Sequence, residues 1–361
     1  MKLAVVDLRL HYPPSGGACV DLFATLSRLR ISFDIRLFHP TWTGAFPRGN
    51  CLDRPPLPVE PVPVKSVTRE EIVSALRAAV DAWKPNVVFV TDGWTLKPYL
   101  VSAFAKSYPT ILRLYAYEML CPRNNERWLQ DRACNNSLLL DSRQCLACAA
   151  QYRDVVKKHR GQDGNPLTHE AECARIWDGF YPDAVRSALH DACTVIVYNH
   201  WLANHLKTLL AIDPVVLPGG VDPAAFPPAQ NAQRAPNTPW RIFVPGRMDD
   251  PAKGADIAVN VGKQLAAKGI SFHMTITRRP NLNYPWLEET NWLPQATLAE
   301  RLRTSDIVLV PSIWEEAFGM TWVEAMATGL PVIASAVAGP RDYIRSEETG
   351  LLFPPGDANA A

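Results

Sequence analysis

Two carboxylates, Glu316 and Glu324, lie on either side of a short aromatic and glycine-containing turn. That turn, residues 318–320, leads into an apolar stretch ending at Gly329, which suits a helix C-terminus because glycine tolerates a positive φ. We therefore expect Glu316 just before a helix and Glu324 about one turn inside it. Backbone N–H groups at a helix start are free to bind an anion. Since carboxylates accept hydrogen bonds from sugar hydroxyls, the pattern predicts a site for a polyol phosphate.

Around this site the sequence resembles the retaining family 4 glycosyltransferases, which have the GT-B fold. Four blocks carry the resemblance, in chain order: Pro218–Asp222, Gly246–Arg247 with Lys253–Gly254, the E-x7-E block Glu316–Glu324, and Gly339–Ile344 with Thr349–Phe353. It covers the second half of the chain almost fully and the first half loosely. By this resemblance, Glu316 faces the sugar of a nucleotide-sugar donor and Glu324 holds the ribose hydroxyls. The amides of Phe318, Gly319 and Met320 would meet sugar and phosphate.

Two basic residues upstream are suited to binding a diphosphate. Arg247 follows Gly246 after a predicted strand, and Lys253 opens the next predicted helix. Both should lie at the carboxyl ends of strands, where doubly wound sheets bind ligands. The resemblance implies that they bind the donor diphosphate. Because the sequence has no Asp-x-Asp motif, we expect fixed cations and amide dipoles, with no catalytic metal, to stabilise the leaving group.

The first half offers weaker candidates for an acceptor site. Gly16 and Gly17 form a turn between the first predicted strand and a helix, where backbone can approach a ligand closely. By resemblance this loop lies near the acceptor. Tyr115 occupies the position where many family members have a histidine, so no histidine role can be carried over. Glu118 is the nearest ionisable residue for acceptor contact or proton transfer, with a solvated loop glutamate as the alternative.

Four cysteines, Cys121, Cys134, Cys145 and Cys148, have the spacing C-x12-C-x10-C-x2-C. Four thiolates could satisfy a tetrahedral structural zinc, and the closely spaced last pair is typical of a metal knuckle. An iron–sulfur cluster is a weaker candidate for the same ligands. The alternative is a set of scattered thiols that pack as small hydrophobic side chains.

Composition excludes several classes of protein. The net charge of +1 over 361 residues gives no electrostatic footprint for nucleic acid. No segment approaches the about 20 consecutive apolar residues of a membrane span. The N-terminus reads as a strand and lacks the features of a signal peptide. We therefore expect a cytoplasmic protein, with peripheral membrane contact left open.

Apolar, β-branched runs alternate with helical patterns along most of the chain, which predicts parallel sheets with crossover helices. The expected fold class is α/β: two Rossmann-like, doubly wound domains facing across a cleft, as in GT-B. We expect an acceptor domain at residues 1–226 with a cysteine-rich insertion at about 120–182, and a nucleotide-sugar domain at 227–361. Family members continue with crossover helices, which we expect this chain to lack. The proline-rich stretch Pro55–Pro63 is expected to be an irregular loop in extended conformation.

The predicted function is transfer of a hexosyl group from a nucleotide-sugar to a glycan or glycolipid hydroxyl, with retention of configuration. Two alternatives stay open. One is an inactive nucleotide-sugar-binding or scaffold protein with the same fold. The other is a GT-B epimerase or phosphorylase, which would share the sheets and the phosphate contacts.

Overall fold

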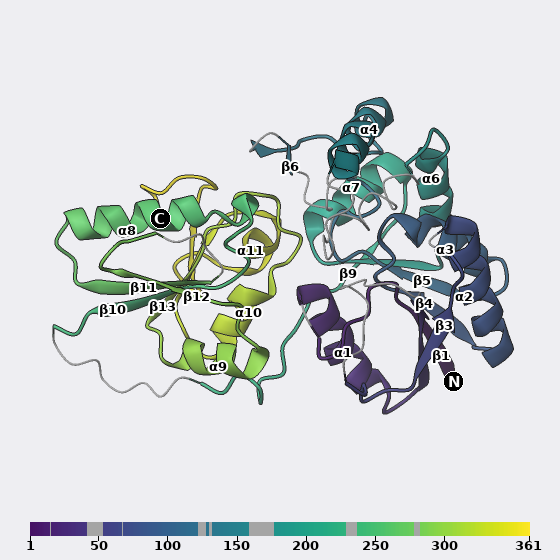
Figure 1. Cartoon of the computed structure of the whole chain (residues 1–361), viewed down its shortest axis with the longest axis horizontal. Helices are drawn as coiled ribbons and strands as arrows, with labels where there is room; N and C mark the ends of the chain where they lie inside the picture. Colours follow the sequence, from purple (N-terminus) through teal and green to yellow (C-terminus); the bar gives the residue numbers. More distant parts are fainter. Residues whose placement is uncertain are drawn as a thin grey trace. The chain divides into compact units, whose positions relative to one another are not determined.

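The computed structural model describes residues 1–14, 16–41, 53–66, 68–121, 128–129, 132–158, 177–228, 237–277 and 282–361. The chain forms two compact units (Figure 1). Unit 1 comprises residues 1–127 and 135–218, and unit 2 comprises residues 128–134 and 219–361. The units thus divide between Pro218 and Gly219, whereas the sequence analysis placed the domain boundary after residue 226. The roles assigned to the two domains stay predictions.

Unit 1 contains a seven-stranded sheet in which each neighbouring pair of strands is parallel. Its order is β3 (Val59–Pro63), β2 (Asp34–Thr41), β1 (Lys2–Val6), β4 (Val87–Val90), β5 (Thr110–Arg113), β8 (Thr194–Val197) and β9 (Val215–Val216). The helices are α1 (Gly17–Leu29), α2 (Arg69–Trp83), α3 (Lys97–Ala105), α4 (Ser142–Lys158), α6 (Tyr181–Asp191) and α7 (His200–Leu210), with a short 3-10 helix, η1 (Trp94–Leu96). Strands β2 and β3 are added in turn on one side of β1, and β4 then lies on the other side of β1. The boundary between β1 and β4 is therefore the point where the strand order reverses.

Unit 2 contains a six-stranded parallel sheet. Its order is β12 (Leu287–Thr290), β11 (Phe272–Thr277), β10 (Trp240–Val244), β13 (Ile307–Val310), β14 (Val332–Ser335) and β15 (Leu351–Phe353). Its helices are η2 (Pro251–Lys253), α8 (Ala255–Ala267), α9 (Gln295–Arg303), α10 (Met320–Ala327) and α11 (Ala338–Tyr343). Here the strand order reverses between β10 and β13. A separate two-stranded antiparallel pair is formed by β6 (Trp128–Leu129) and β7 (Arg132–Ala133).

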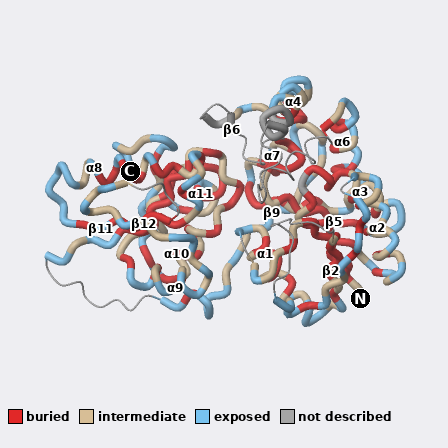
Figure 2. Tube along the Cα trace, viewed as in Figure 1, coloured by how far each residue is buried: buried red, intermediate tan, exposed pale blue. Residues whose placement is uncertain are grey.

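Each unit has its own apolar core, as expected when strands are covered by amphipathic helices. In unit 1, residues of β1 and β2 such as Val5 and Leu37 pack with Leu22 and Leu26 of α1. In unit 2, Val244 and Met274 from the strands pack with Ala258 of α8. Figure 2 shows buried residues along the central strands of both units. None of the described helices is long and apolar enough to cross a lipid bilayer.

The predicted α/β class and the two parallel sheets are confirmed, but several elements differ from the sequence-based expectation. The stretch expected to be an irregular loop contains β3, whose Pro61 and Pro63 are tolerated because β3 is an edge strand. Helix α4 and the short strands β12 and β15 were not predicted. Part of the predicted insertion at 120–182 lies outside the described residues.

Candidate functional site

The candidate donor site lies at the carboxyl ends of β10 and β13 in unit 2. Gly246 and Arg247 follow β10, whereas Ser312 and Glu316 follow β13. Because the strand order reverses between these two strands, their ends flank the crevice where doubly wound sheets bind ligands. The topology therefore brings together residues that are about 65 positions apart in the sequence.

Glu316 is held by a partner on each carboxylate oxygen. Lys253 Nζ lies 2.6 Å from Oε1, and Ser312 Oγ donates a 2.6 Å hydrogen bond to Oε2. The Lys253 and Glu316 side chains are only 13% and 12% exposed. Burial would raise the pKa of Glu316, but the charge of Lys253, the hydrogen bonds from Lys253 and Ser312, and the charge of Arg247 together lower it. Glu316 is therefore a charged acceptor whose direction is fixed.

The turn that carries Lys253 is bound closely to the end of β13. Asp250 Oδ1 accepts a 3.0 Å hydrogen bond from Ala252 N, and Asp250 Oδ2 lies 3.3 Å from Arg247 Nη2. Gly254 has a φ of 76°, and a Cβ there would lie 1.9 Å from Pro311 O. A side chain at this position would thus separate the Lys253 turn from β13. The sequence suggested that Lys253 opens a helix. In the structure it is instead the last residue of the 3-10 helix η2.

Two further contacts shape this end of the sheet. Thr277 Oγ1 at the end of β11 accepts a 2.8 Å hydrogen bond from Gly246 N and donates to Gly246 O, which fixes the turn before Arg247. Lys253 Nζ lies 5.0 Å from the centroid of the Trp314 ring. The ring of Trp314 therefore supports the ammonium group on a second side.

The expected turn and helix after Glu316 are present. Gly319 has a φ of 85° and precedes α10, which begins at Met320 and has no side-chain cap. Phe318 and Met320 are buried, and a Cβ on Gly339 would lie 2.2 Å from Phe318 O. The segment before α10 thus packs directly against Gly339, and the first-turn N–H groups of α10 carry the partial positive charge of the helix dipole.

Glu324 is buried on α10, at 3% exposure. Gln295 Nε2, on the first residue of α9, donates a 2.9 Å hydrogen bond to Glu324 Oε1. Burial raises the pKa of Glu324 to about 7, and the Gln295 hydrogen bond opposes part of that rise. The sequence analysis placed Glu324 inside this helix but did not identify Gln295 as its partner.

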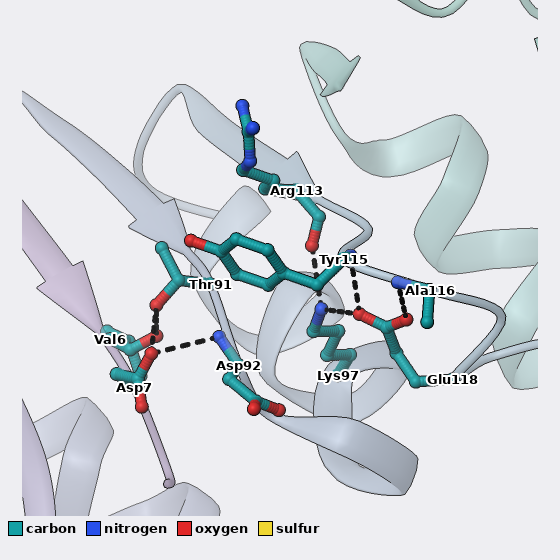
Figure 3. Close-up of polar contacts among 9 residues, drawn as sticks. All are labelled: Val6, Asp7, Thr91, Asp92, Lys97, Arg113, Tyr115, Ala116 and Glu118. Atoms are coloured by element: carbon teal, nitrogen blue, oxygen red, sulfur yellow. Dashed lines mark hydrogen bonds and ion pairs between the residues drawn. The ribbon is translucent and has the colours of Figure 1, made fainter. Parts of the chain in front are cut away.

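Glu118 in unit 1 has a position different from the one expected for an acceptor-binding group. It is 2% exposed, pairs with the fully buried Lys97, and accepts hydrogen bonds from Tyr115 N at 2.9 Å and Ala116 N at 2.8 Å (Figure 3). Burial would raise the pKa of Glu118, but the charge and hydrogen bond of Lys97 and the backbone amides lower it. Both oxygens are occupied by the loop after β5, so Glu118 holds that loop in place.

A different carboxylate lies at the strand-order reversal of unit 1. Asp7 follows β1, and its Oδ2 accepts hydrogen bonds from Thr91 Oγ1 at 2.7 Å and Asp92 N at 3.1 Å, just after β4 (Figure 3). Burial and then the charge of Asp92 raise the pKa of Asp7 to about 7. Sequence reasoning missed Asp7, although an ionisable residue directly after the first buried strand was a usable signal.

The predicted glycine turn is present next to this edge of the sheet. Gly16 has a φ of 83° and precedes α1, which begins at Gly17. Both glycines are exposed, and a Cβ on Gly16 would meet no atom within 4 Å. The turn therefore requires glycine for its backbone angle, and its proximity to an acceptor stays a prediction.

The four cysteines expected to bind zinc are not brought together as a metal site. Within the described part of the chain, no three His, Cys, Asp or Glu side chains are placed to hold a metal ion. Cys145 and Cys148 lie on helix α4, so their C-x2-C spacing belongs to a helix and forms no knuckle turn. Asn136 Nδ2 donates to Cys145 Sγ at 3.3 Å. Zinc binding by the four cysteines stays a prediction that the described residues do not support.

Comparison with known proteins agrees with this geometry. Residues 278–361 match the family model of the glycosyl transferases group 1. A phosphatidyl-myo-inositol mannosyltransferase from Mycolicibacterium smegmatis is 29% identical over 159 residues, covering 42% of this chain and 41% of that relative. The match therefore spans less than half of the relative's length.

Solved structures resemble the whole chain. HepE from Anabaena, in complex with UDP, has a TM-score of 0.64 at 15% identity and covers 100% of this chain and 87% of its own. Sucrose-phosphate synthase from Thermosynechococcus elongatus has a TM-score of 0.63 at 18% identity, covering 99% and 87%. The fold is therefore GT-B, with two parallel-sheet α/β units. The match at residues 278–361 confirms the resemblance to the group 1 glycosyltransferases drawn from the sequence.

Proposed function

We propose that this protein is a retaining glycosyltransferase that moves a hexosyl group from a nucleoside-diphosphate sugar to an acceptor hydroxyl. The observation that carries the proposal is the Lys253–Glu316–Ser312 network at the strand-order reversal of unit 2. It places a cation and an oriented carboxylate at one ligand crevice. The group 1 match includes both Glu316 and Glu324, and HepE binds UDP and UDP-glucose in its solved complexes.

In the proposed binding mode, Arg247 and Lys253 bind the diphosphate, and the start of α10 adds its dipole. Glu316 accepts hydrogen bonds from the donor sugar, and Glu324 accepts them from the ribose. As the bond between sugar and phosphate breaks, negative charge grows on the departing diphosphate. Preorganised cations and amides stabilise that charge in a partly buried site. In the proposed mechanism these groups take the place of a catalytic metal.

Retention of configuration would follow if the acceptor attacks the face that the diphosphate leaves. The departing phosphate then accepts the proton of the acceptor hydroxyl, so no protein base is required. This fits unit 1, where Lys97 and the backbone amides occupy both oxygens of Glu118. We propose a glycan or glycolipid acceptor and peripheral membrane contact, since the mannosyltransferase relative is named for a phosphatidyl-inositol substrate. The cytoplasmic location stays a prediction.

The test is calorimetry against a panel of nucleoside diphosphates and nucleotide-sugars with a chelator present. The wild-type protein should bind the nucleotides of at least one base. Turnover should release nucleoside diphosphate in proportion to the glycosylated product. NMR should show that this product keeps the anomeric configuration of the donor. No binding would contradict the donor site. An inverted product would contradict the mechanism.

A second candidate is a nucleotide-sugar-binding protein without turnover. The tyrosine at position 115, where many members of the resembled family have a histidine, favours it. Donor binding without hydrolysis or transfer to any acceptor of a broad sugar and lipid panel would support this candidate over the enzyme.

A further inference from the structure

Ser312 belongs to the network at the proposed donor site, but its effect on ligand binding has not been assigned. It follows β13 directly after Pro311, and its side chain is buried at 1% exposure. A buried hydroxyl without a partner costs stability, and Ser312 Oγ has its partner in Glu316 Oε2 at 2.6 Å. The hydroxyl therefore points at the carboxylate that the proposed function assigns to the donor sugar.

We propose that Ser312 is a positioning residue that aims the Glu316 carboxylate at the sugar of a nucleotide-sugar, and so sets the affinity for the sugar separately from that for the nucleotide. This inference rests on the proposed function and deepens it. Lys253 on Oε1 and Ser312 on Oε2 together fix the plane of the carboxylate. The remaining lone pairs then have defined directions, which hydrogen bonding to one set of sugar hydroxyls requires.

The backbone around Ser312 and Glu316 is already fixed by other contacts. Ile313 N donates to Ala252 O at 2.9 Å, which joins the residue after Ser312 to the turn of Lys253. Gly339 N donates to Glu316 O at 2.9 Å. With the main chain held at both places, the remaining freedom is the rotation of the Glu316 side chain, and the Ser312 hydroxyl restricts it.

Loss of the hydroxyl should affect the two parts of the donor unequally. Without Ser312 Oγ, the Oε2 atom of Glu316 loses a short hydrogen bond. The Glu316 carboxylate can then turn both oxygens toward the Lys253 ammonium group. The diphosphate contacts of Arg247 and Lys253 do not include Ser312. Removal of the hydroxyl should therefore weaken the contacts with the sugar and leave the affinity for the nucleoside diphosphate unchanged.

The experiment compares dissociation constants for a nucleoside diphosphate and its nucleotide-sugar, measured by calorimetry on the full chain. Ser312→Ala should weaken binding of the nucleotide-sugar about tenfold relative to the nucleoside diphosphate, as expected for one hydrogen bond to a charged group. Ser305→Ala is the matched control: Ser305 is also a buried serine of unit 2, at 7% exposure, and its Oγ donates to Arg301 O at 2.8 Å. Ser305→Ala should leave unchanged the ratio of the two dissociation constants, that for the nucleotide-sugar over that for the nucleoside diphosphate.

Two more variants separate positioning from folding. Ser312→Thr keeps the hydroxyl and should retain the wild-type ratio. Ser312→Cys keeps the side-chain volume but offers only a weak S–H donor, so it should reproduce the loss if Ser312→Ala does not fold.

Each outcome decides one claim. A changed ratio with an unchanged nucleoside diphosphate constant supports the inference. Equal weakening of both ligands, or no change in either, overturns it while the proposed function stands. If wild type binds neither ligand, the proposed function and this inference are both wrong.

Discussion

At the scale of single residues, the candidate donor site depends on charges that are paired before any ligand arrives. Lys253 and Glu316 are mostly buried and lie 2.6 Å apart. Removing one member of such a pair leaves the other as a poorly solvated charge, which is more costly than removing both. Stability and ligand binding can therefore be separated by comparing single and double variants.

Lys253→Ala should weaken nucleoside diphosphate binding by about 10- to 100-fold, because one of the two diphosphate cations is lost. It should also lower the free energy of unfolding by about 1–3 kcal/mol, since Glu316 Oε1 loses its partner. The double variant Lys253→Ala/Glu316→Gln should recover most of that stability but none of the binding. Calorimetry and urea unfolding measure the two effects, and recovery of binding in the double variant would contradict the role of Lys253.

Glu324 should make stability depend on pH. Its pKa is raised from 4.5 to about 7 in the folded chain, so the folded state holds this proton more tightly than the unfolded state. Stability is therefore greatest below the unfolded pKa, falls as pH rises from 4.5 toward 7, and levels off above that.

Glu324→Gln removes this loss, because the amide has no proton to give up. We expect the variant to exceed wild type in unfolding free energy at pH 8 by on the order of 3 kcal/mol, with little difference at pH 4. Urea unfolding at both pH values measures the difference. An equal offset at both pH values would show that Glu324 is not buried as described.

At the scale of elements, the site is built from short turns bound to strand ends. The turn of Lys253 reaches Glu316 only because Gly254 lets the backbone approach Pro311 O. Sheet topology then decides which turns meet, since the ends of β10 and β13 are neighbours although α8, β11, β12 and α9 separate them in the chain.

Gly254→Ala should lower the free energy of unfolding by more than about 2 kcal/mol and weaken nucleoside diphosphate binding, because its Cβ would lie 1.9 Å from Pro311 O. Gly269→Ala is a close control. Gly269 has a similar φ of 69° in the same unit, but a Cβ there would meet nothing within 4 Å. It should cost only the backbone strain, about 1 kcal/mol, and leave binding intact. Equal effects of both changes on binding would contradict the close-approach argument.

At the scale of the whole molecule, the two units have separate sheets and separate cores. The proposed donor site lies entirely in unit 2. The buried pair Lys97–Glu118 lies entirely in unit 1 and holds the loop after β5. Damage to this pair should therefore affect one unit and spare donor binding by the other.

Glu118→Ala should lower the stability of unit 1 by about 3–5 kcal/mol, because it leaves the Lys97 ammonium buried without its partner. The apolar double variant Lys97→Met/Glu118→Leu should lose less, because no charge is left buried and only the N–H groups of Tyr115 and Ala116 lack their acceptor. Both should keep wild-type affinity for nucleoside diphosphate at temperatures where unit 1 is folded. Unfolding curves and calorimetry test this, and a loss of affinity in the double variant would show that the pair contributes to donor binding.

The sequence by itself determined the class of fold and the residue types at the candidate site. Alternation of apolar runs and helical patterns is a local signal, because each strand and helix must bury its own face. Helix α2 (Arg69–Trp83) and strand β13 (Ile307–Val310) are elements of this kind. Spacing also indicated that Glu316 precedes a helix and that Glu324 lies within it.

The tertiary structure alone decided which groups are partners. Ser312, Asp250 and Gln295 carry no distinctive local pattern, and their contacts follow from strand order and burial. Cys145 and Cys148 have the spacing of a metal knuckle, but a helix places them differently. Glu118 is charged, as expected, but it is buried and not exposed to an acceptor, because it pairs with the buried Lys97. Pairing across a parallel sheet depends on contacts between residues far apart in the chain, and such contacts leave little trace in the local sequence.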